Sequence, residues 1–505
     1  MTKAAKVGSS RWACVILGFL ALARIATAAE TKESGRVDVI LWFDTEDYLL
    51  PADDDASKRL AEMLTQKGVR ATFKVVGEKA RVLEKRGRTD VIEALKKHDI
   101  GYHANYHSVH PTPSEYLADC GLLDGMEEFI RREGGGAADV RRIFGVDTLA
   151  CYGQPGSSWG SQTIAALGQI GVAPHGIPTY VDEGNHIGLK GRPFWYCNAL
   201  VVYDMPPNRT RFELHIPQAL EPGKKAVSEI AERLRGQGGG LISIFYHPCE
   251  WVHKQFWDGV NFSRGANPPP SQWKAPPQRS PEETESAFER FGQYIDHIKS
   301  LGVRFVTASE LGGIYPDRVR TEGATEEEIG EIASRLAKAD SKGIDFAVLN
   351  GKSFSPADQL EILLSADEKK PPRGLLGPDG AGPAVGEGSP ENVDWPAFAE
   401  AMRDMKDFAA REKRVPARVF IGADAVRPED FLVGLARAYL EKKKSGSWPT
   451  EVVLGKNVEL LTAQRVAKDS PGIFGGWVIH KEGFRAPKIL EVARWQAWTL
   501  KPAMR

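Results

Sequence analysis

The chain of 505 residues is poor in cysteine, carries almost no net charge and has no long apolar run beyond its first 30 residues. It contains five cysteines and no C-x-x-C pair, which argues against a zinc site built from cysteines. The net charge of −1 argues against a nucleic-acid partner, because nucleic-acid-binding proteins usually carry a basic face. With 42% hydrophobic and 26% charged residues, the composition is that of a globular protein of one to three domains.

The first 29 residues have the pattern of a secretory signal peptide. Basic residues precede an apolar run from Trp12 to Ala23, and residues 26–28 (ATA) offer a cleavage site. The run is short for a membrane span, so an uncleaved anchor is the alternative. Cleavage removes four positive charges and no negative one, so the net charge changes from −1 to −5. We therefore expect a secreted or periplasmic protein of the cell envelope, in which disulfides are permitted.

Short apolar runs alternate with charged amphipathic segments between residues 36 and 315. Residues 37–43 (VDVILWF) and 71–76 (ATFKVV) predict buried strands, with a helical segment between them. Such alternation predicts an α/β domain with a parallel sheet or a β/α barrel. A proline-rich stretch at residues 263–282 predicts a long ordered loop or a flexible lid.

A smaller region of mixed α/β character is predicted over residues 321–505, with a Pro/Gly-rich linker at 370–393. Residues 348–364 and 419–436 share one pattern: a short apolar strand, a glycine turn, a proline followed by an acid, and an apolar helix. A weaker third copy starts at Val453. The repeats resemble pseudomurein-binding cell-wall repeats, which implies binding to an envelope polymer, although a plain structural cap fits equally well.

Three polar clusters each follow a predicted strand. Residues 43–47 (FDTED) occupy a position that faces the active-site mouth in β/α barrels, although a solvated acidic turn has the same pattern. His103 and His107, four residues apart, would lie on one face of a helical turn and could bind one metal ion; the alternative is two ordinary surface histidines. His247 follows the apolar run 241–245, where it could also be a core residue.

Taken together, these clusters resemble the polysaccharide deacetylases of carbohydrate esterase family 4, over about residues 36–315. Residues 71–73 (ATF), 100–103 (IGYH) and 303–307 (VRFVT) match that family in order and spacing. The resemblance implies a distorted (β/α) barrel and a secreted hydrolase that removes N-acetyl groups from an envelope or extracellular polysaccharide. It also implies a glycan substrate and one divalent metal ion as cofactor, with zinc expected.

The resemblance also implies a role for individual residues. It implies that Asp44 is the catalytic base and that His247 is the catalytic acid. It also implies that His103 and His107 are the two imidazoles that bind the metal ion. The carboxylate ligand is either Glu46 or Asp47. Because aspartate is the usual ligand in the family, Asp47 is favoured.

The third motif departs from the family. Where the family has an arginine that contacts the base, this chain has Gln154, followed by Pro155. Glutamine brings no charge, so we expect the base to lose a stabilising cation and to have a higher pKa, unless another residue supplies the charge. Gln154, Pro155 and Trp251 are predicted to contact the substrate. Trp257 and Trp273 could also stack on sugar rings, although tryptophan is equally a core residue.

Two other functions fit the same residues. One is hydrolysis of a C–N bond in a non-carbohydrate amide on the same scaffold, which the glutamine keeps open. The other is a catalytically inactive envelope-binding protein, in which the C-terminal repeats act as the anchor and the barrel only holds glycans. The sequence does not specify the oligomeric state.

Overall fold

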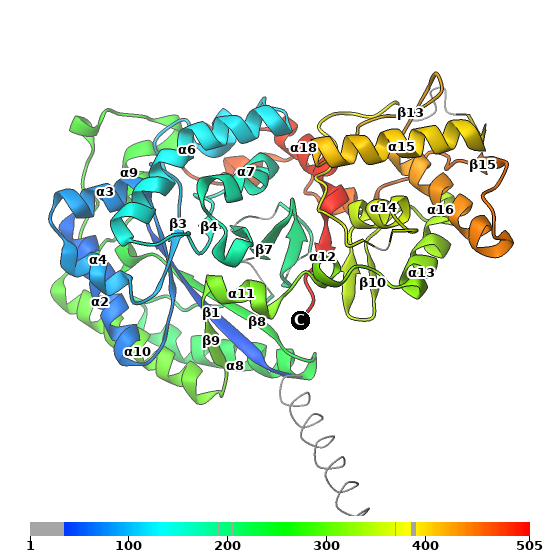
Figure 1. The fold of residues 1–505 in the computed structure, drawn as a ribbon. Helices are drawn as coiled ribbons and strands as arrows, with labels where there is room; N and C mark the ends of the chain where they lie inside the picture. Colours follow the sequence, from blue (N-terminus) through cyan, green and yellow to red (C-terminus); the bar gives the residue numbers. More distant parts are fainter. Residues whose placement is uncertain are drawn as a thin grey trace, which may run out of the picture.

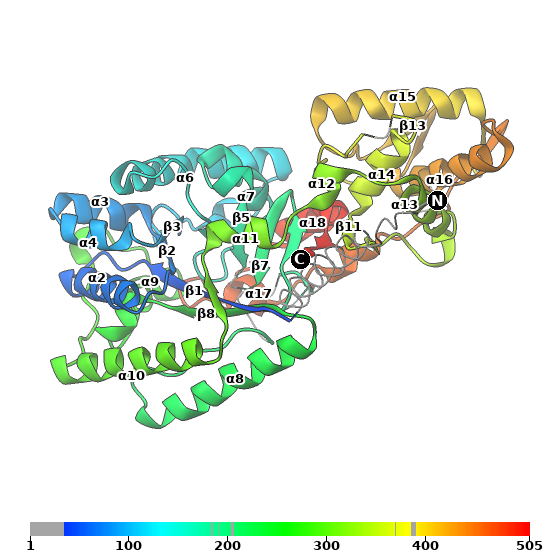
Figure 2. The same ribbon diagram turned by 60° about the horizontal axis from the view of Figure 1, so that its bottom comes forward.

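The computed structural model describes residues 35–505 apart from residues 183, 185, 190, 204–206, 369 and 385–389. The predicted signal peptide, residues 1–29, lies outside the described residues. Within the described part, no helix has the length and apolarity that a membrane crossing requires. The two largest hydrophobic clusters, which we call the first and the second core, lie around a large sheet and among the helices of a second region (Figure 1, Figure 2).

The large sheet has ten strands in the order β16-β6-β7-β5-β4-β3-β2-β1-β8, with β9 also paired to β1. Only β6 runs antiparallel to its neighbours among these strands. The strands are β1 Val37–Thr45, β2 Thr72–Val75, β3 Asp99–Tyr102, β4 Tyr152–Gly153, β5 Thr179–Asp182, β6 Phe194–Tyr196, β7 Ala199–Tyr203, β8 Gly240–Tyr246, β9 Arg304–Val306 and β16 Lys501–Pro502.

Strand β1 lies next to the edge strand β8 and is buried along its whole length. It pairs with β8 along one edge and with both β2 and β9 along the other. β8 and β16 are the two edges of the described sheet, so the sheet curls without closing on itself. The prediction of a distorted (β/α) barrel is confirmed, and its parallel order brings the carboxyl ends of β1, β2, β3 and β8 together.

Amphipathic helices cover the outer face of the curled sheet (Figure 2). They are α2 Pro51–Gln66, α3 Gly77–Lys85, α4 Thr89–Leu95, α6 Leu122–Phe144, α8 Leu220–Gly236 and α10 Pro281–Ser300. The start of α10 follows from its sequence, because Ser280 and Glu283 form a capping box and Pro281 occupies the first turn. The proline-rich stretch at 263–282 is an ordered loop whose Trp273 packs against Tyr48 and Trp257.

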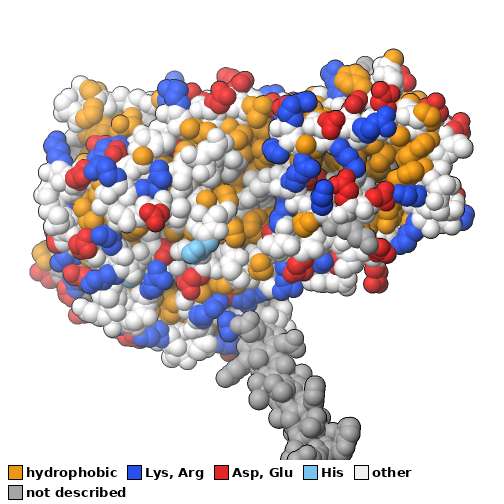
Figure 3. All heavy atoms as spheres, in the orientation of Figure 1, with side chains coloured by type: hydrophobic (Ala, Val, Ile, Leu, Met, Phe, Trp, Pro, Cys, Tyr) orange, Lys and Arg blue, Asp and Glu red, His pale blue; other side chains and the backbone are white. Residues whose placement is uncertain are grey.

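The second region consists of helices and short hairpins. Two hairpin–helix units lie where the pattern repeats in the sequence. In the first, the hairpin of β10 (Ala347–Leu349) and β11 (Lys352–Phe354) precedes α14 (Pro356–Leu364). In the second, the hairpin of β13 (Val419–Ile421) and β14 (Asp424–Val426) precedes α16 (Pro428–Ser445). α13 Glu326–Leu336 and α15 Trp395–Glu412 complete the core. On the face shown in Figure 3, basic and acidic side chains are interspersed over both regions.

The third copy predicted at Val453 is wrong. Val453 ends β15 (Glu451–Val453), which pairs with β12 (Asn392–Asp394). The backbone that follows pairs with Ile344, through hydrogen bonds from the Ile344 amide to Glu459 and from the Leu461 amide to Ile344. These contacts occupy the segment that a hairpin would need.

The last part of the chain returns to the first core. Phe474, Leu490 and Leu500 belong to the same hydrophobic cluster as the barrel strands, from α17 (Pro471–Gly475), α18 (Pro487–Gln496) and the segment before β16. The second core is built from residues 319–458 together with Trp498. The predicted linker at 370–393 contributes Leu375 to that core. The four cysteines of the described residues, Cys120, Cys151, Cys197 and Cys249, are free thiols.

Candidate metal-binding and catalytic site

Polar side chains gather where β1, β3 and β8 end. Asp44 is the penultimate residue of β1, His103 directly follows β3, and His247 directly follows β8. Because these strands are parallel, their carboxyl ends lie at one edge of the sheet, where α/β proteins bind their ligands. The fold therefore brings together side chains that are about 200 residues apart in the sequence.

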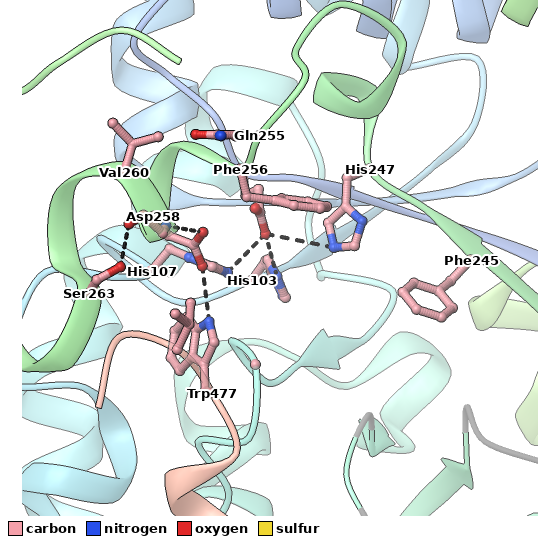
Figure 4. A pocket seen from close by; sticks show the side chains of 14 residues that line it. His103, His107, Phe245, His247, Gln255, Phe256, Asp258, Val260, Ser263 and Trp477 are labelled. Carbon is pink, nitrogen blue, oxygen red and sulfur yellow. Dashed lines mark hydrogen bonds and ion pairs between the residues drawn. The ribbon is translucent and has the colours of Figure 1, made fainter. Parts of the chain in front are cut away.

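Glu46, His103 and His107 form a buried cluster. Figure 4 labels its two histidines. One potential ligand atom from each lies within 4.8 Å of the other two. The Oε2 atom of Glu46 is 2.9 Å from Nε2 of His107 and 3.5 Å from Nε2 of His103. One carboxylate and two imidazoles at this spacing form a donor set for a divalent metal ion.

The environment of the two imidazoles suits metal binding. Nδ1 of His103 donates to the carbonyl of Gly153 at 2.9 Å, which fixes the tautomer and leaves Nε2 facing Glu46. Nδ1 of His107 is 2.6 Å from the hydroxyl of Ser108. Burial lowers the pKa of His103, and it lowers the pKa of His107 to about 4. Both rings are therefore neutral at physiological pH, which is the form that binds a metal.

The i,i+4 spacing predicts that the two histidines lie on a helical turn, and this prediction is wrong. They lie in a loop in which Ala104 and His107 have φ angles of 65° and 57°. The carbonyl of Ala104 accepts a hydrogen bond from the amide of Gly77. A Cβ atom on Gly77 would lie 2.8 Å from the Asn105 side chain, so the close approach of this loop requires glycine there. Left-handed backbone at non-glycine residues is strained and persists where surrounding contacts fix it.

Glu46, and not the favoured Asp47, lies with the two histidines. Side chains alternate along an extended backbone, so Glu46 is on the same side as Asp44 and Asp47 points to the other side. The Oδ2 atom of Asp47 is 3.0 Å from Nδ1 of His253, and its backbone carbonyl accepts a hydrogen bond from Lys79. Asp47 therefore belongs to a buried polar network behind the site.

Lys74 supplies a positive charge beside Asp44. Its ammonium is 2.7 Å from Oδ1 of Asp44, and both side chains are completely buried. A Cβ atom on Gly153 would lie 2.5 Å from Cδ of Lys74, and one on Gly101 would lie 3.2 Å from Cγ. These glycines leave the space through which the lysine reaches the carboxylate. Burial alone would raise the pKa of Asp44, but Lys74, with contributions from His103 and His247, brings it below its ordinary value of 3.8.

Gln154 makes neutral contacts next to this pair. Its amide donates to the carbonyl of Gly156 at 2.9 Å and accepts from the hydroxyl of Tyr180 at 2.7 Å. Of the two alternatives that the sequence left open, the structure supports the one in which another residue supplies the charge, because Lys74 provides a cation from a different strand. The expected rise in the pKa of the base is wrong. Gln154 and Pro155 are buried and do not line the cleft described below, so the structure does not place them as substrate contacts.

The predicted substrate contact at Trp251 is also wrong. Its side chain is fully buried in the first core, with ring centroids 5.6 Å from Tyr246 and 5.2 Å from Phe291. A large aromatic side chain that follows a strand end was equally compatible with a core position, and the packing between β8 and α10 decides for it.

His247 is held by two charged side chains, Glu250 and Arg211, that the sequence did not point to. Its Nδ1 is 2.8 Å from Oε1 of Glu250, and Glu250 forms an ion pair with Arg211. Its Nε2 is 3.6 Å from Oδ2 of Asp44. Burial would lower the pKa of His247, but Glu46, Glu250 and Asp44 outweigh it and raise the pKa to about 10. His247 is therefore protonated where Asp44 is ionised.

A cleft of about 520 Å³ opens over the cluster (Figure 4). Glu46, His103, His107 and His247 line this cleft. The other lining residues come from the third motif, from β8, from the segment after His247 and from the C-terminal part of the chain. They are Gly156, Phe245, Gln255, Phe256, Asp258, Gly259, Val260, Ser263, Trp477 and Val478. Neither Asp258 nor Trp477 was identified from the sequence. Their hydrogen bond joins residues 219 positions apart.

No family model matches the sequence, and the comparison with curated proteins found no match. The solved structures similar to this chain include a provisionally assigned polysaccharide deacetylase from Mycobacterium smegmatis, at 13% identity over 58% of this chain and 93% of that one, with a TM-score of 0.35. A family 4 acetyl xylan esterase from Clostridium thermocellum, solved with a cobalt ion, shows 15% identity over 55% and 91%, with a TM-score of 0.28. A family 4 pseudoenzyme from Bacillus anthracis shows 13% identity over 55% and 65%, with a TM-score of 0.28. At these low scores, the interpretation of the site depends on its own geometry.

Proposed function

We propose that the protein is a metal-dependent hydrolase that removes acetyl groups from N-acetylated sugars of an envelope or extracellular polysaccharide. The observation that carries the proposal is that a Glu/His/His donor set and a protonated imidazole, His247, line one cleft, with the ionised carboxylate of Asp44 buried 3.6 Å from His247. Amide hydrolysis needs these three elements: an electrophile for the carbonyl, a base for water and an acid for the leaving nitrogen.

The residues present fit a divalent ion. The two Nε2 atoms and the Glu46 carboxylate face one point, and the second nitrogen of each ring already has a partner. Mixed imidazole and carboxylate donors suit zinc and related first-row metals. A metal ion held there would supply Lewis-acid chemistry, polarising the acetamide carbonyl and lowering the pKa of a water molecule.

Asp44 and His247 have complementary roles in this proposal. Asp44 is ionised, lies beside the metal-binding residues and takes the proton of the attacking water. His247 holds a proton and delivers it from Nε2 to the nitrogen as the C–N bond breaks. A C–O bond forms as the C–N bond breaks, so the products are acetate and a free amine. Lys74 keeps Asp44 ionised in its buried position, and Glu250 keeps His247 protonated.

We further propose that the protein acts outside the cytoplasm, on the basis of the signal-peptide pattern in residues 1–29. Binding of an envelope polymer by the C-terminal hairpin–helix units remains a proposal based on their sequence pattern. The location of the protein and the binding of an envelope polymer are both independent of the chemistry of the cleft.

The test is metal content and acetate release from N-acetylated glycans, measured on the chain from residue 30 onward. We expect the wild type to bind one divalent ion and to release acetate, and His103→Ala to lose both. His175→Asn is the matched control, because His175 is exposed and lies outside the cleft. Bound metal without acetate release would favour a non-carbohydrate amide substrate. A wild type that binds no metal would contradict the proposal and favour an envelope-binding scaffold.

A further inference from the structure

The C-terminal part of the chain forms one wall of the cleft. Trp477 and Val478 line the cleft, although they are more than 220 residues away from His247 in the sequence. The Trp477 ring lies edge to face with His107, with a centroid separation of 5.2 Å and an interplanar angle of 81°. A side chain outside the barrel strands therefore reaches the ring of a metal-binding residue.

This wall is held in place from several sides. The hydroxyl of Ser157 donates to the carbonyl of Phe474 at 2.6 Å, which ties the segment to the third motif. The amides of Arg264 and Gly265 donate to the carbonyls of Val478 and Ile479 at 3.0 and 2.7 Å. The segment is thus bonded to loops on both sides of the cleft, and it is a fixed part of the cleft wall.

The position of the indole depends on a glycine. Gly156 has a φ angle of 50°, and a Cβ atom there would lie 2.3 Å from Cδ2 of Trp477. The ring of Trp477 is half-buried and remains part of the cleft surface. The third motif and the C-terminal segment therefore fit together at this point.

Asp258 connects this wall to the segment after His247. Its Oδ2 accepts a hydrogen bond from the indole of Trp477 at 2.9 Å. Its Oδ1 accepts from the amide of Gly259 at 2.5 Å. The carboxylate is only 5% exposed, yet it lines the cleft and is held in one orientation. Phe256 adds an aromatic surface to the cleft, because its side chain is 39% exposed. Its ring lies nearly perpendicular to the ring of His247, with a centroid separation of 4.8 Å (Figure 4).

We propose that Trp477, Phe256 and Asp258 form the sugar-binding subsite of the cleft, with the two aromatic side chains contacting the apolar surfaces of a pyranose ring and the carboxylate accepting hydrogen bonds from its hydroxyls. This rests on the proposed deacetylase function and names the residues that hold its substrate. Aromatic surfaces next to a fixed carboxylate match the alternating C–H and O–H surfaces of a sugar ring. The cleft volume of about 520 Å³ is that of a site for a small ligand, so it holds a short part of a glycan.

The consequence is that the C-terminal chain supplies substrate recognition to the barrel. The residues that would carry out the chemistry come from strand ends of the barrel, and Trp477 comes from the segment between α17 and α18. Substrate affinity and chemistry should therefore be separable by mutation.

The experiment is calorimetric binding of N-acetylchitotriose to the zinc-loaded protein and to Trp477→Ala and Asp258→Asn, together with kcat and KM for acetate release. We expect Trp477→Ala to weaken binding by about 10-fold and Asp258→Asn by about 10- to 100-fold, mainly as a rise in KM. Phe420→Ala is the matched control, since Phe420 is 58% exposed on the β13–β14 hairpin. Asp258→Asn keeps the size of the side chain and tests the subsite even if the alanine variant fails to fold.

The outcomes separate this proposal from the one on which it rests. Unchanged affinity in both folded variants would overturn the subsite, even if the wild type released acetate. Binding that depends on Trp477 and Asp258 without acetate release would support the subsite and contradict the deacetylase. A metal-loaded wild type that does not bind the trisaccharide would overturn the subsite as a sugar site.

Discussion

The two cores of the molecule use buried charges differently. In the first region, Glu46, Asp44 and Lys74 are buried at the carboxyl ends of neighbouring strands and lie in or beside one cleft. In the second region, the buried Asp358 accepts a hydrogen bond from the amide of Ser355 and so fixes the start of α14. It also pairs with Lys501 of β16, at 2.9 Å. Glu46 of the first region lines an open cleft, whereas Asp358 of the second region is paired with a lysine within the fold.

The chain between the two regions shows why they are not separate modules. Trp498 packs into the second core, whereas Leu500, two residues later, packs into the first. Lys501 bridges Asp358 of the second region and Asp317, near the end of the barrel. The red C-terminal segment in Figure 1 accordingly lies between the two regions. The second region is therefore braced against the barrel, and the same returning chain delivers Trp477 to the cleft.

The largest expected effect concerns the carboxylate ligand. Glu46→Gln should abolish metal binding and acetate release, because an amide is a far weaker metal donor than a carboxylate. Asp47→Asn should keep the metal, since Asp47 faces His253 behind the site. Metal content by elemental analysis and acetate release measure the two variants side by side. Loss of metal in Asp47→Asn with retention in Glu46→Gln would reverse the assignment.

Two buried lysines provide a direct comparison between the regions. Lys74→Met should lower the free energy of unfolding by about 3–5 kcal/mol and also remove most activity, because Asp44 loses its partner. Lys501→Met should cost a similar free energy, because Asp358 loses a buried partner, yet the folded protein should keep its activity. Urea unfolding and acetate release at low urea measure both. Equal loss of activity in the two folded variants would mean that the second region takes part in the chemistry.

Core truncations compare the two clusters. Leu490→Ala and Leu435→Ala each remove a fully buried leucine side chain and should each cost about 2–5 kcal/mol. Leu490 packs with the barrel although it lies in α18, so its loss should also weaken metal binding. Leu435 of α16 belongs to the second core, and its loss should leave metal affinity unchanged. Metal titration of the folded variants, beside their unfolding curves, distinguishes one shared core from two.

The smallest expected effect is a shift in a pH profile. Glu250 helps to raise the pKa of His247 to about 10, so Glu250→Gln should lower that pKa. The acid form of His247 is then lost at lower pH, and the alkaline limb of kcat/KM moves to lower pH. The raised pKa also predicts that the stabilisation from His247 is complete below its ordinary value of 6.5 and is lost as the pH rises through about 10. An alkaline limb that stays in place in Glu250→Gln would assign the acid role to another group.

The sequence alone determined the elements whose cause is local. The apolar run at 37–43 predicted β1, and polar residues after such runs pointed to the cluster at 43–47, to His103 with His107, and to His247. The family resemblance singled out Asp44 within the first cluster. The repeated pattern predicted a strand, a turn and a helix in each of two units, because turn and helix-start signals act over a few residues. These signals need no information from distant parts of the chain. The second strand of each hairpin, β11 and β14, was not predicted.

Only the tertiary structure decided which residues complete the site. Lys74 occurs in an apolar strand. Its ion pair with Asp44 depends on Gly101 and Gly153 of two other strands, because these glycines leave room for the lysine side chain to reach the carboxylate. Alternation along the backbone, seen in three dimensions, chose Glu46 over Asp47. Trp477 reaches the cleft because the chain returns from the second core to the first. The physical reason is common to these cases: each depends on close packing between segments distant in sequence, and sequence patterns report only on neighbours along the chain.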